Sequence, residues 1–193
     1  MKIQSNLIVI FILLNCLFNC YSQNNYKQHD NPLNHTYETS GDYIQLILPI
    51  SAGLTTIIKK DWEGTKQFAF SYATTLAITY SLKTIVDKKR PESNTLYNSF
   101  PSGHTASAFS GASFIQRRYG WKYGKWAYLL ATFVGVSRIE GGTQWHDPWD
   151  ILGGAAVGIG STYIFTKPNQ QDKIDIGFIT GNDNYVLTFN YKF

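Results

Sequence analysis

Uncharged stretches rich in apolar residues alternate with short polar or charged segments along most of this chain of 193 residues. Within the stretches the apolar residues recur with a helical spacing, and Gly, Pro or charged residues separate one stretch from the next. The pattern predicts helices over residues 43–58, 67–87, 104–116, 122–136 and 149–165. We therefore expect an all-α fold, a helical bundle that occupies residues 43–166 as one domain.

The tail of the chain, residues 167–193, has a different pattern. From Ile174 onward apolar and polar residues alternate, with Gly181-Asn182-Asp183-Asn184 as a turn sequence in the middle. This alternation predicts a linker followed by a short C-terminal β-hairpin. Its last strand resembles the final strand of outer-membrane barrels, but one hairpin cannot close a barrel, so a docked or partner-pairing ribbon is favoured.

The first 22 residues resemble a targeting segment. Lys2 precedes an apolar stretch from Leu7 to Phe18, and polar residues follow, which is typical of a signal peptide cleaved near Ser22. An uncleaved membrane anchor is a second interpretation, and a lipoprotein attached at Cys20 is a third. We expect an exported protein of a bacterial-type cell envelope, periplasmic or membrane-associated, with an irregular lead-in over residues 23–42.

Composition narrows the setting further. The formal net charge of +4 is too small and too scattered along the chain to favour nucleic-acid binding. Both cysteines, Cys16 and Cys20, lie in the N-terminal segment, so cleavage near Ser22 would leave no disulfide to form. The hydrophobic content of 44% is sufficient for a sizeable core, and Gly154 and Gly158 would permit close packing between helices.

Three cationic residues form the first candidate cluster for chemistry. A phosphoryl group in transfer carries negative charge on its equatorial oxygens, and fixed cations stabilise that charge. Lys83, Arg90 and Arg138 supply such cations. Lys83 and Arg90 are seven positions apart, which on a continuous helix would put them within roughly 20° of the same face. Their neighbours Lys88 and Lys89 are expected on a solvated helix face.

The second cluster is Pro101-Ser102-Gly103-His104, followed by an apolar-periodic stretch. Proline favours a turn or helix start, and Gly103 lets the main chain approach a ligand closely. Free amides at that helix start would stabilise an anion. The hydroxyl of Ser102 either donates to the same anion or serves only as a helix cap, and the sequence does not separate the two roles.

The third cluster, His146 to Asp150, supplies the chemistry. Asp147 is expected to be the N-cap of a helix whose first residue is Pro148, so that Asp150 lies in the first turn. Asp150 would then hydrogen-bond one ring nitrogen of His146 and leave the other as a nucleophile. His104 is the candidate general acid. A zinc or iron site is another interpretation of the two histidines and Asp150, but the nearby cations oppose a divalent metal.

These residues, in this order, resemble the signature of the type 2 phosphatidic-acid phosphatase superfamily, which includes lipid phosphate phosphatases, class A acid phosphatases and vanadium haloperoxidases. The first two motifs match in full, as Lys83-x6-Arg90-Pro91 and Pro101-Ser102-Gly103-His104. In the third, seven rather than five residues separate Ser137-Arg138 from His146-x3-Asp150. The resemblance spans roughly residues 43–166 and implies the helical bundle of that superfamily.

The resemblance also implies a role for each site residue. His146 would attack phosphorus and form a phosphohistidine, Asp150 would orient His146, and His104 would protonate the leaving alcohol and later activate water. The phosphate oxygens would be held by Lys83, Arg90, Ser102, the Gly103 amide and Arg138. The superfamily's phosphatases need no metal, so we expect no metal and no cofactor.

Membrane association is expected from the resemblance, because the lipid-acting members of the superfamily are membrane proteins. The uncharged stretches at 43–58, 67–82 and 151–166 are slightly shorter than the ~20 residues that span hydrocarbon, and the mean hydropathy of −0.19 is low for a polytopic protein. Tryptophans near the ends of the expected helices would suit a membrane interface.

The favoured function is a metal-independent phosphatase that hydrolyses a phosphorylated lipid, such as phosphatidic acid, a polyprenyl diphosphate or a lipid A phosphate. A soluble acid phosphatase acting on small phosphate esters is the nearest alternative. A vanadate-dependent haloperoxidase and a non-catalytic envelope protein that binds anionic lipid are the others. The sequence does not indicate the oligomeric state.

Overall fold

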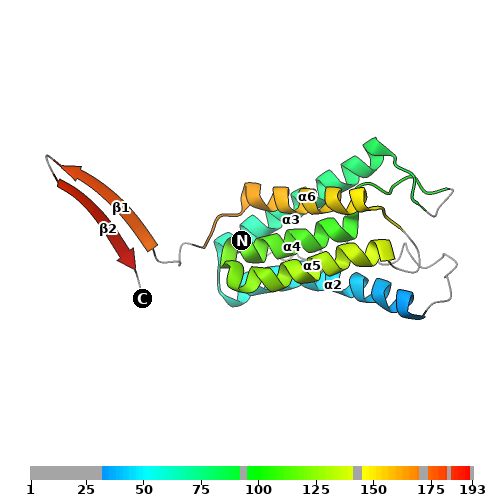
Figure 1. The fold of residues 1–193 in the computed structure, drawn as a ribbon, viewed down its shortest axis with the longest axis horizontal. Coiled ribbons are helices and arrows are strands. Elements are labelled where there is room, and N and C mark those ends of the chain that lie inside the picture. The colour runs from blue at the N-terminus through cyan, green and yellow to red at the C-terminus, as the bar shows by residue number, and fades with distance from the viewer. Residues whose placement is uncertain (1–31, 92–94, 141–144, 170–173, 182–183, 192–193) are drawn as a thin grey trace, which may run out of the picture.

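The structure is a computed structural model that describes residues 32–91, 95–140, 145–169, 174–181 and 184–191. In these ranges five helices run alongside one another as a bundle (Figure 1). The helices are α2 (Pro32–Ile58), α3 (Trp62–Val86), α4 (Gly103–Tyr119), α5 (Trp121–Glu140) and α6 (Pro148–Phe165). The predicted all-α helical fold is confirmed, and each of the five expected helices is present.

The start of α2 departs from the expectation. The helix begins at Pro32 rather than at residue 43, so the described part of the expected irregular lead-in is helical. Tertiary contacts explain the difference, because Glu38 and Asp42, one helical turn apart, both bind Arg138 at the end of α5. A polar segment with the composition of a loop is held as a helix by these bonds. The expected targeting segment, residues 1–22, lies outside the described residues.

Helix α4 lies in the middle of the bundle and packs against α2, α3, α5 and α6. Glycines allow the close approach between α4 and α6, as expected for Gly154 and Gly158. A Cβ atom on Gly158 would lie only 2.8 Å from the amide nitrogen of Ser110. The two backbones therefore touch at a position where any larger side chain would force them apart.

The interior of the bundle is unusually polar. Its apolar part consists of two small clusters, one around Ala108 and Val134 and the other around Phe68 and Phe114. Thirteen buried hydroxyl side chains of the helices and their caps lie among them, at Thr56, Ser71, Thr75, Thr79, Ser102, Thr105, Ser107, Ser110, Ser113, Ser137, Ser161, Thr162 and Thr166. Most bond a carbonyl of the preceding helical turn or a facing side chain, so their polar atoms need no water.

The outer surface is correspondingly apolar. Large hydrophobic side chains are exposed along α2, α3, α5 and α6, including Ile47, Leu54, Phe70, Ile78, Trp126, Leu129, Leu152 and Ile164. A polar interior inside an apolar exterior reverses the usual arrangement of a water-soluble bundle. Among the described helices, α2 over His35–Ile58 has the length and composition needed to cross a membrane.

At the end of the bundle where α2 passes into α3, a buried ion pair links the N-cap of α3 to the last turn of α4. The guanidinium of Arg118 binds the carboxylate of Asp61, with Nε 2.7 Å from Oδ2, and Tyr119 donates its hydroxyl to the same oxygen at 3.1 Å. Arg118 also donates to the carbonyl of Lys167 at 3.0 Å, which fixes the chain just after α6. We call this the Asp61 end of the bundle.

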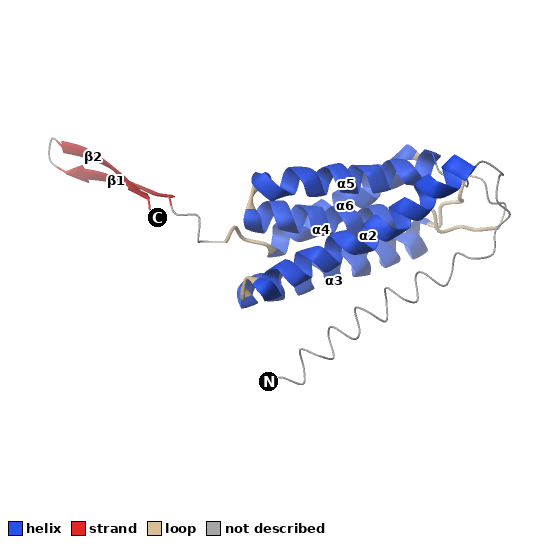
Figure 2. Cartoon of the chain, turned by 90° about the horizontal axis from the view of Figure 1, so that it is seen from below, coloured by secondary structure: helices blue, strands red, loops and turns tan. Residues whose placement is uncertain are grey.

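Beyond the bundle, strands β1 (Ile174–Gly181) and β2 (Asn184–Tyr191) pair antiparallel, with Ile174 opposite Tyr191 and Gly181 opposite Asn184 (Figure 2). The turn residues between them lie outside the described ranges. The role expected of these paired strands, as a docked or partner-pairing ribbon, stays a prediction.

Candidate active site

The three predicted clusters meet at the end of the bundle opposite Asp61, where α3 and α5 end and α4 and α6 begin (Figure 1). They surround a cavity of about 240 Å³. Six of the eight predicted site residues line it, namely Lys83, Arg90, Gly103, His104, Arg138 and His146. The other two, Ser102 and Asp150, are buried directly behind this lining.

His146 is placed by the start of α6. Asp147 is the N-cap and Pro148 is the first helical residue, as the sequence predicts, and Asp147 and Asp150 also form a reciprocal capping box. This local geometry puts His146 just before the helix, with Nδ1 of its ring 3.4 Å from Oδ2 of Asp150. Because Nδ1 faces the carboxylate, Nε2 is the nitrogen left to react within the cavity.

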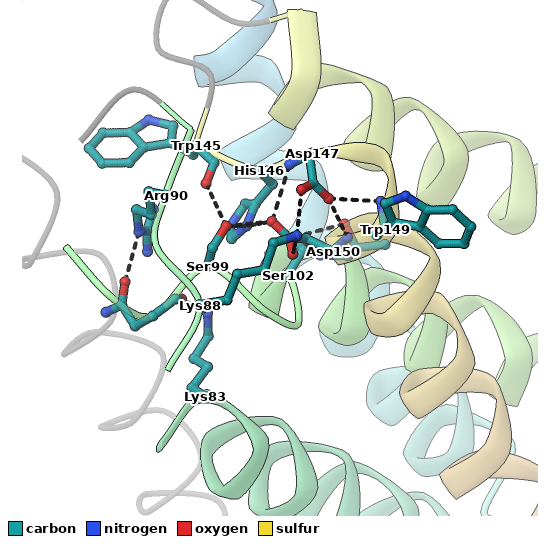
Figure 3. A network of polar contacts seen from close by, with 12 residues as sticks. Lys83, Lys88, Arg90, Ser99, Ser102, Trp145, His146, Asp147, Trp149 and Asp150 are labelled. Carbon is teal, nitrogen blue, oxygen red and sulfur yellow. Dashed lines mark hydrogen bonds and ion pairs between the residues drawn. The ribbon is translucent and has the colours of Figure 1, made fainter. Parts of the chain in front are cut away.

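Asp150 receives more partners than the sequence suggests (Figure 3). Its carboxylate accepts hydrogen bonds from Nζ of Lys88 at 2.8 Å, from the amide of Asp147 at 3.1 Å and from the hydroxyl of Ser99. Burial alone would raise the pKa of Asp150, but bonds from His146, Lys88 and Ser99 hold it below its usual value. The carboxylate behind His146 is therefore ionised at neutral pH.

Lys88 and Ser99 are not among the predicted site residues. The expectation that Lys88 lies on a solvated helix face is wrong, because it lies beyond α3 and bridges Asp147 and Asp150. Burial opposes its charge, yet the hydrogen bonds to these two carboxylates raise the pKa of Lys88. Only the basic run Lys88-Lys89-Arg90 marks this segment in the sequence.

The His146 ring is kept neutral. Burial lowers its pKa to about 4, and the charges of Lys83 and Arg90 act in the same direction, while the hydrogen bond to Asp150 opposes them. A neutral imidazole with one nitrogen bonded to a carboxylate has its other lone pair available for attack on phosphorus.

The cations Lys83 and Arg90 reach the cavity by a route other than the predicted one. They do not share a helix face, because α3 ends at Val86 and Asp87 adopts a left-handed conformation with φ of 45°. Pro91 disfavours a helical conformation at Arg90, which lies in the following loop. Asn98 joins the two, since its carbonyl accepts from Lys83 at 2.6 Å and its side chain from Arg90 at 2.7 Å.

Lys83 lies against the start of α4. A Cβ atom on Gly103 would be 3.8 Å from Cε of Lys83, so the ammonium group and the first amides of α4 border the same space. Burial lowers the pKa of Lys83 to about 8, and the charge of Arg90 adds to this effect. The cavity therefore concentrates positive charge where a phosphate would bind.

Ser102 is the N-cap of α4. Its hydroxyl accepts from the amide of Thr105 at 3.4 Å and from the Thr105 hydroxyl at 3.0 Å. Of its two expected roles the capping role is therefore present, while its contact with phosphate stays a prediction.

The general-acid candidate His104 has a carboxylate partner that the sequence does not indicate. Nε2 of His104 lies 3.1 Å from Oδ1 of Asp42, and Nη1 of Arg138 lies 2.7 Å from the same oxygen. Burial lowers the pKa of His104, the charges of Arg138 and Lys83 add to this, and Asp42 opposes it. Asp42 belongs to the segment expected to be irregular, so no signal ties it to the site.

The histidine of the third motif, His146, lines the cavity although this motif is two residues longer than the superfamily pattern. Residues 141–144 lie outside the described ranges, but Trp145 follows them and also lines the cavity. The guanidinium of Arg90 stacks 4.8 Å above the Trp145 ring, whose Nε1 donates to Glu38 at 2.6 Å.

Within the described ranges no three His, Cys, Asp or Glu side chains are grouped to hold a metal ion. The expectation of a metal-free site stays a prediction.

Comparison with known proteins identifies the class to which this fold and site belong. The pattern that defines the PAP2 superfamily matches residues 64–173, more than half of the chain. The chain therefore belongs to the PAP2 superfamily, which confirms the resemblance seen in its motifs. It is a phosphatase of that superfamily.

Two relatives and one solved structure make the comparison more specific. The chain is 29% identical over 187 residues to a lipid A 4'-phosphatase of Helicobacter pylori, a match that covers 86% of this chain and 92% of the relative. It is 45% identical over 73 residues to a lipid A 1-phosphatase of Porphyromonas gingivalis, covering 36% of this chain and 16% of that protein. The crystal structure of Aquifex aeolicus LpxE is similar with a TM-score of 0.59 and 26% identity, covering 69% of this chain and 86% of that one.

Proposed function

We propose that this protein removes a phosphate group from lipid A, or from a closely related glycolipid, through a phosphohistidine formed on His146. The observation that carries the proposal is the neutral His146 ring, held at Nδ1 by Asp150, in a cavity lined by Lys83, Arg90 and Arg138. A lipid substrate is supported by the two lipid A phosphatases among the relatives.

In the first step Nε2 of His146 attacks phosphorus, and the bond to the lipid oxygen breaks as His104 gives that oxygen a proton. The three cations and the first amides of α4 stabilise the charge on the equatorial oxygens. In the second step His104 takes a proton from water, whose oxygen attacks the phosphohistidine. Inorganic phosphate leaves and His146 is regenerated as a neutral ring.

The 4'-phosphate is the favoured position on the lipid, because the 4'-phosphatase matches along nearly its whole length whereas the 1-phosphatase matches over a short segment. The cavity lining also includes four large and mainly apolar side chains of α2 and α3, Leu46, Tyr72, Leu76 and Tyr80. Thr79 lines it as well, and its buried hydroxyl has no hydrogen-bond partner among the described residues. These side chains suit the glycolipid part of a substrate better than a small soluble ester.

The bundle is proposed to lie in a membrane, with its apolar outer surface in contact with lipid. The segments in the hydrocarbon are the uncharged middle parts of the helices, and the charged site residues lie at their ends. This arrangement disfavours the alternative of a soluble acid phosphatase, which would expose that surface to water.

The exposed side chains at the Asp61 end indicate how the bundle would be oriented in the membrane. Exposed tryptophans and lysines gather there, at Lys59, Lys60, Trp62, Trp121, Lys122, Lys125 and Trp126. Tryptophan favours the membrane interface, and lysine-rich ends remain on the cytoplasmic side. The catalytic end would then face away from the cytoplasm, on the exported side of the membrane.

The experiment is phosphate release by the full-length protein in detergent, with EDTA present. The substrates are lipid A carrying a phosphate at position 1 only or at position 4' only, phosphatidic acid, a polyprenyl diphosphate and a soluble aryl phosphate. Preferred release from the 4'-phosphorylated lipid that is lost in His146→Ala supports the proposal. Preference for the aryl ester would favour the acid-phosphatase alternative. Phosphate release that is unchanged in His146→Ala would show that the proposed site is not where the reaction occurs.

A further inference from the structure

We propose that Asp42 is a positioning residue of the reaction, which holds the His104 ring and the Arg138 guanidinium together so that His104 can protonate the leaving oxygen. The inference rests on the proposed function, in which His104 is the general acid. Asp42 stands outside the three motifs that define the site in the sequence.

The geometry of the Asp42 carboxylate carries the proposal. One oxygen, Oδ1, lies 3.1 Å from Nε2 of His104 and 2.7 Å from Nη1 of Arg138, and so links α2 to α4 and α5. His104 and Arg138 line the cavity, whereas Asp42 does not. Asp42 therefore acts on the substrate through His104 and Arg138. Because Nε2 of His104 faces Asp42, Nδ1 is the nitrogen left to face the leaving oxygen.

The charges around His104 explain why the ring needs such a partner. Lys83 of α3 and Arg138 of α5 both oppose a positive charge on the ring, and the His146 ring across the cavity is neutral. Asp42 of α2 is the anionic side chain that the described residues place in contact with His104. A general acid must carry its proton when the substrate arrives, so a carboxylate in contact with the ring supports that step.

Asp42 also has a matched neighbour for comparison. Glu38, one helical turn earlier, accepts from Arg138 through its backbone carbonyl at 2.5 Å and from Trp145 through its side chain at 2.6 Å. Its carboxylate thus lies near the site without contacting His104. Glu38→Gln removes the same charge from the same helix and serves as the control for Asp42→Asn.

The test compares two leaving groups. An alkoxide from the lipid sugar needs a proton in order to leave, whereas a nitrophenolate leaves without one, so loss of general acid catalysis affects the lipid alone. In Asp42→Asn, kcat/KM for the lipid A phosphate is expected to fall about a hundredfold, and kcat/KM for nitrophenyl phosphate by less than about threefold. In Glu38→Gln both values are expected to change by the same factor. The ratio kcat/KM is used because it does not depend on the later hydrolysis of the phosphoenzyme.

The outcomes separate this inference from the proposed function. An equal loss on both substrates in Asp42→Asn would show that Asp42 only anchors Arg138 or the fold, and no loss on either would also overturn the inference. If His146→Ala keeps its activity, the proposed function fails whatever Asp42 does.

A second measurement does not depend on turnover. Histidine-ring NMR of the full-length protein in detergent follows the protonation of His104, assigned by the signal missing in His104→Ala. The inference predicts that the His104 ring loses its proton at a lower pH in Asp42→Asn than in the parent or in Glu38→Gln. An unchanged titration would contradict it.

Discussion

Nζ of Lys88 lies 2.8 Å from Oδ1 of Asp150, while the other oxygen of that carboxylate faces the His146 ring. Lys88 thus holds the Asp150 carboxylate in place, and that carboxylate in turn orients the ring of His146, the proposed nucleophile. Because Lys88 is not part of the cavity lining, it acts on the reaction through Asp150 and not through contact with the substrate.

Replacement of Lys88 by Met is expected to lower kcat about tenfold and to leave KM nearly unchanged, because orientation of His146 matters in the transition state and substrate contacts remain. Steady-state kinetics on the preferred lipid measures both values. The control is Lys89→Met, which removes the same charge from the next residue in the chain, whose side chain is exposed. A rise in KM in Lys88→Met with kcat unchanged would show that Lys88 binds substrate instead.

With nitrophenyl phosphate, whose leaving group needs no proton from His104, the pH dependence of kcat/KM is expected to have two limbs that belong to the enzyme. Attack requires neutral His146, so activity falls as the pH drops through about 4, the pKa of that ring. Phosphate binding requires charged Lys83, so activity also falls as the pH rises through about 8, the pKa of that ammonium group. The substrate's own ionisation near pH ~6 is common to all variants and cancels in their ratios.

Lys83→Arg tests the basic limb. Arginine stays charged throughout the measured range, so the fall near pH 8 is expected to disappear even if the overall rate is lower. Lys89→Arg is the matched control and keeps the parent profile. A basic limb that persists unchanged in Lys83→Arg would assign it to another group.

The helix contact at Gly158 gives a prediction on stability. A Cβ atom there would meet the Ser110 amide at 2.8 Å, so Gly158→Ala is expected to destabilise the bundle by about 1–3 kcal/mol. Gly160 lies on the same helix with nothing within 4 Å, and Gly160→Ala is expected to be neutral or slightly stabilising. Thermal unfolding in detergent compares the two. Equal midpoints for both variants would contradict the close packing of α4 against α6.

Local sequence signals predict the helices and much of the site. The N-cap Asp147 and the first helical residue Pro148 are neighbours in the chain, and the order of residues alone indicates how they place His146 just before the helix. The spacing of Gly154 and Gly158 likewise indicates a close helix contact, which the packing of α6 on α4 confirms. Such features depend on a few consecutive residues whose conformational preferences are strong.

Contacts between distant parts of the chain could not be predicted in the same way. Asp42 and Arg138 are 96 positions apart, and Lys88 and Asp150 are 62 apart, so no spacing rule connects them. The polar start of α2 has the composition of an irregular segment, and its helix depends on those distant partners. The prediction that Lys83 and Arg90 share a helix face is wrong for a local reason, since Pro91 disfavours helix at Arg90.

The measurement that tests the central proposal most directly is the trapping of a phosphoenzyme. The protein is mixed with a lipid substrate carrying labelled phosphate, quenched in alkali, where phosphohistidine survives, and digested for peptide mass spectrometry. We predict label on the peptide that contains His146, its loss in acid, and its absence from His146→Ala. Labelled phosphoenzyme in His146→Ala, or label on a different residue of the parent, would contradict His146 as the nucleophile.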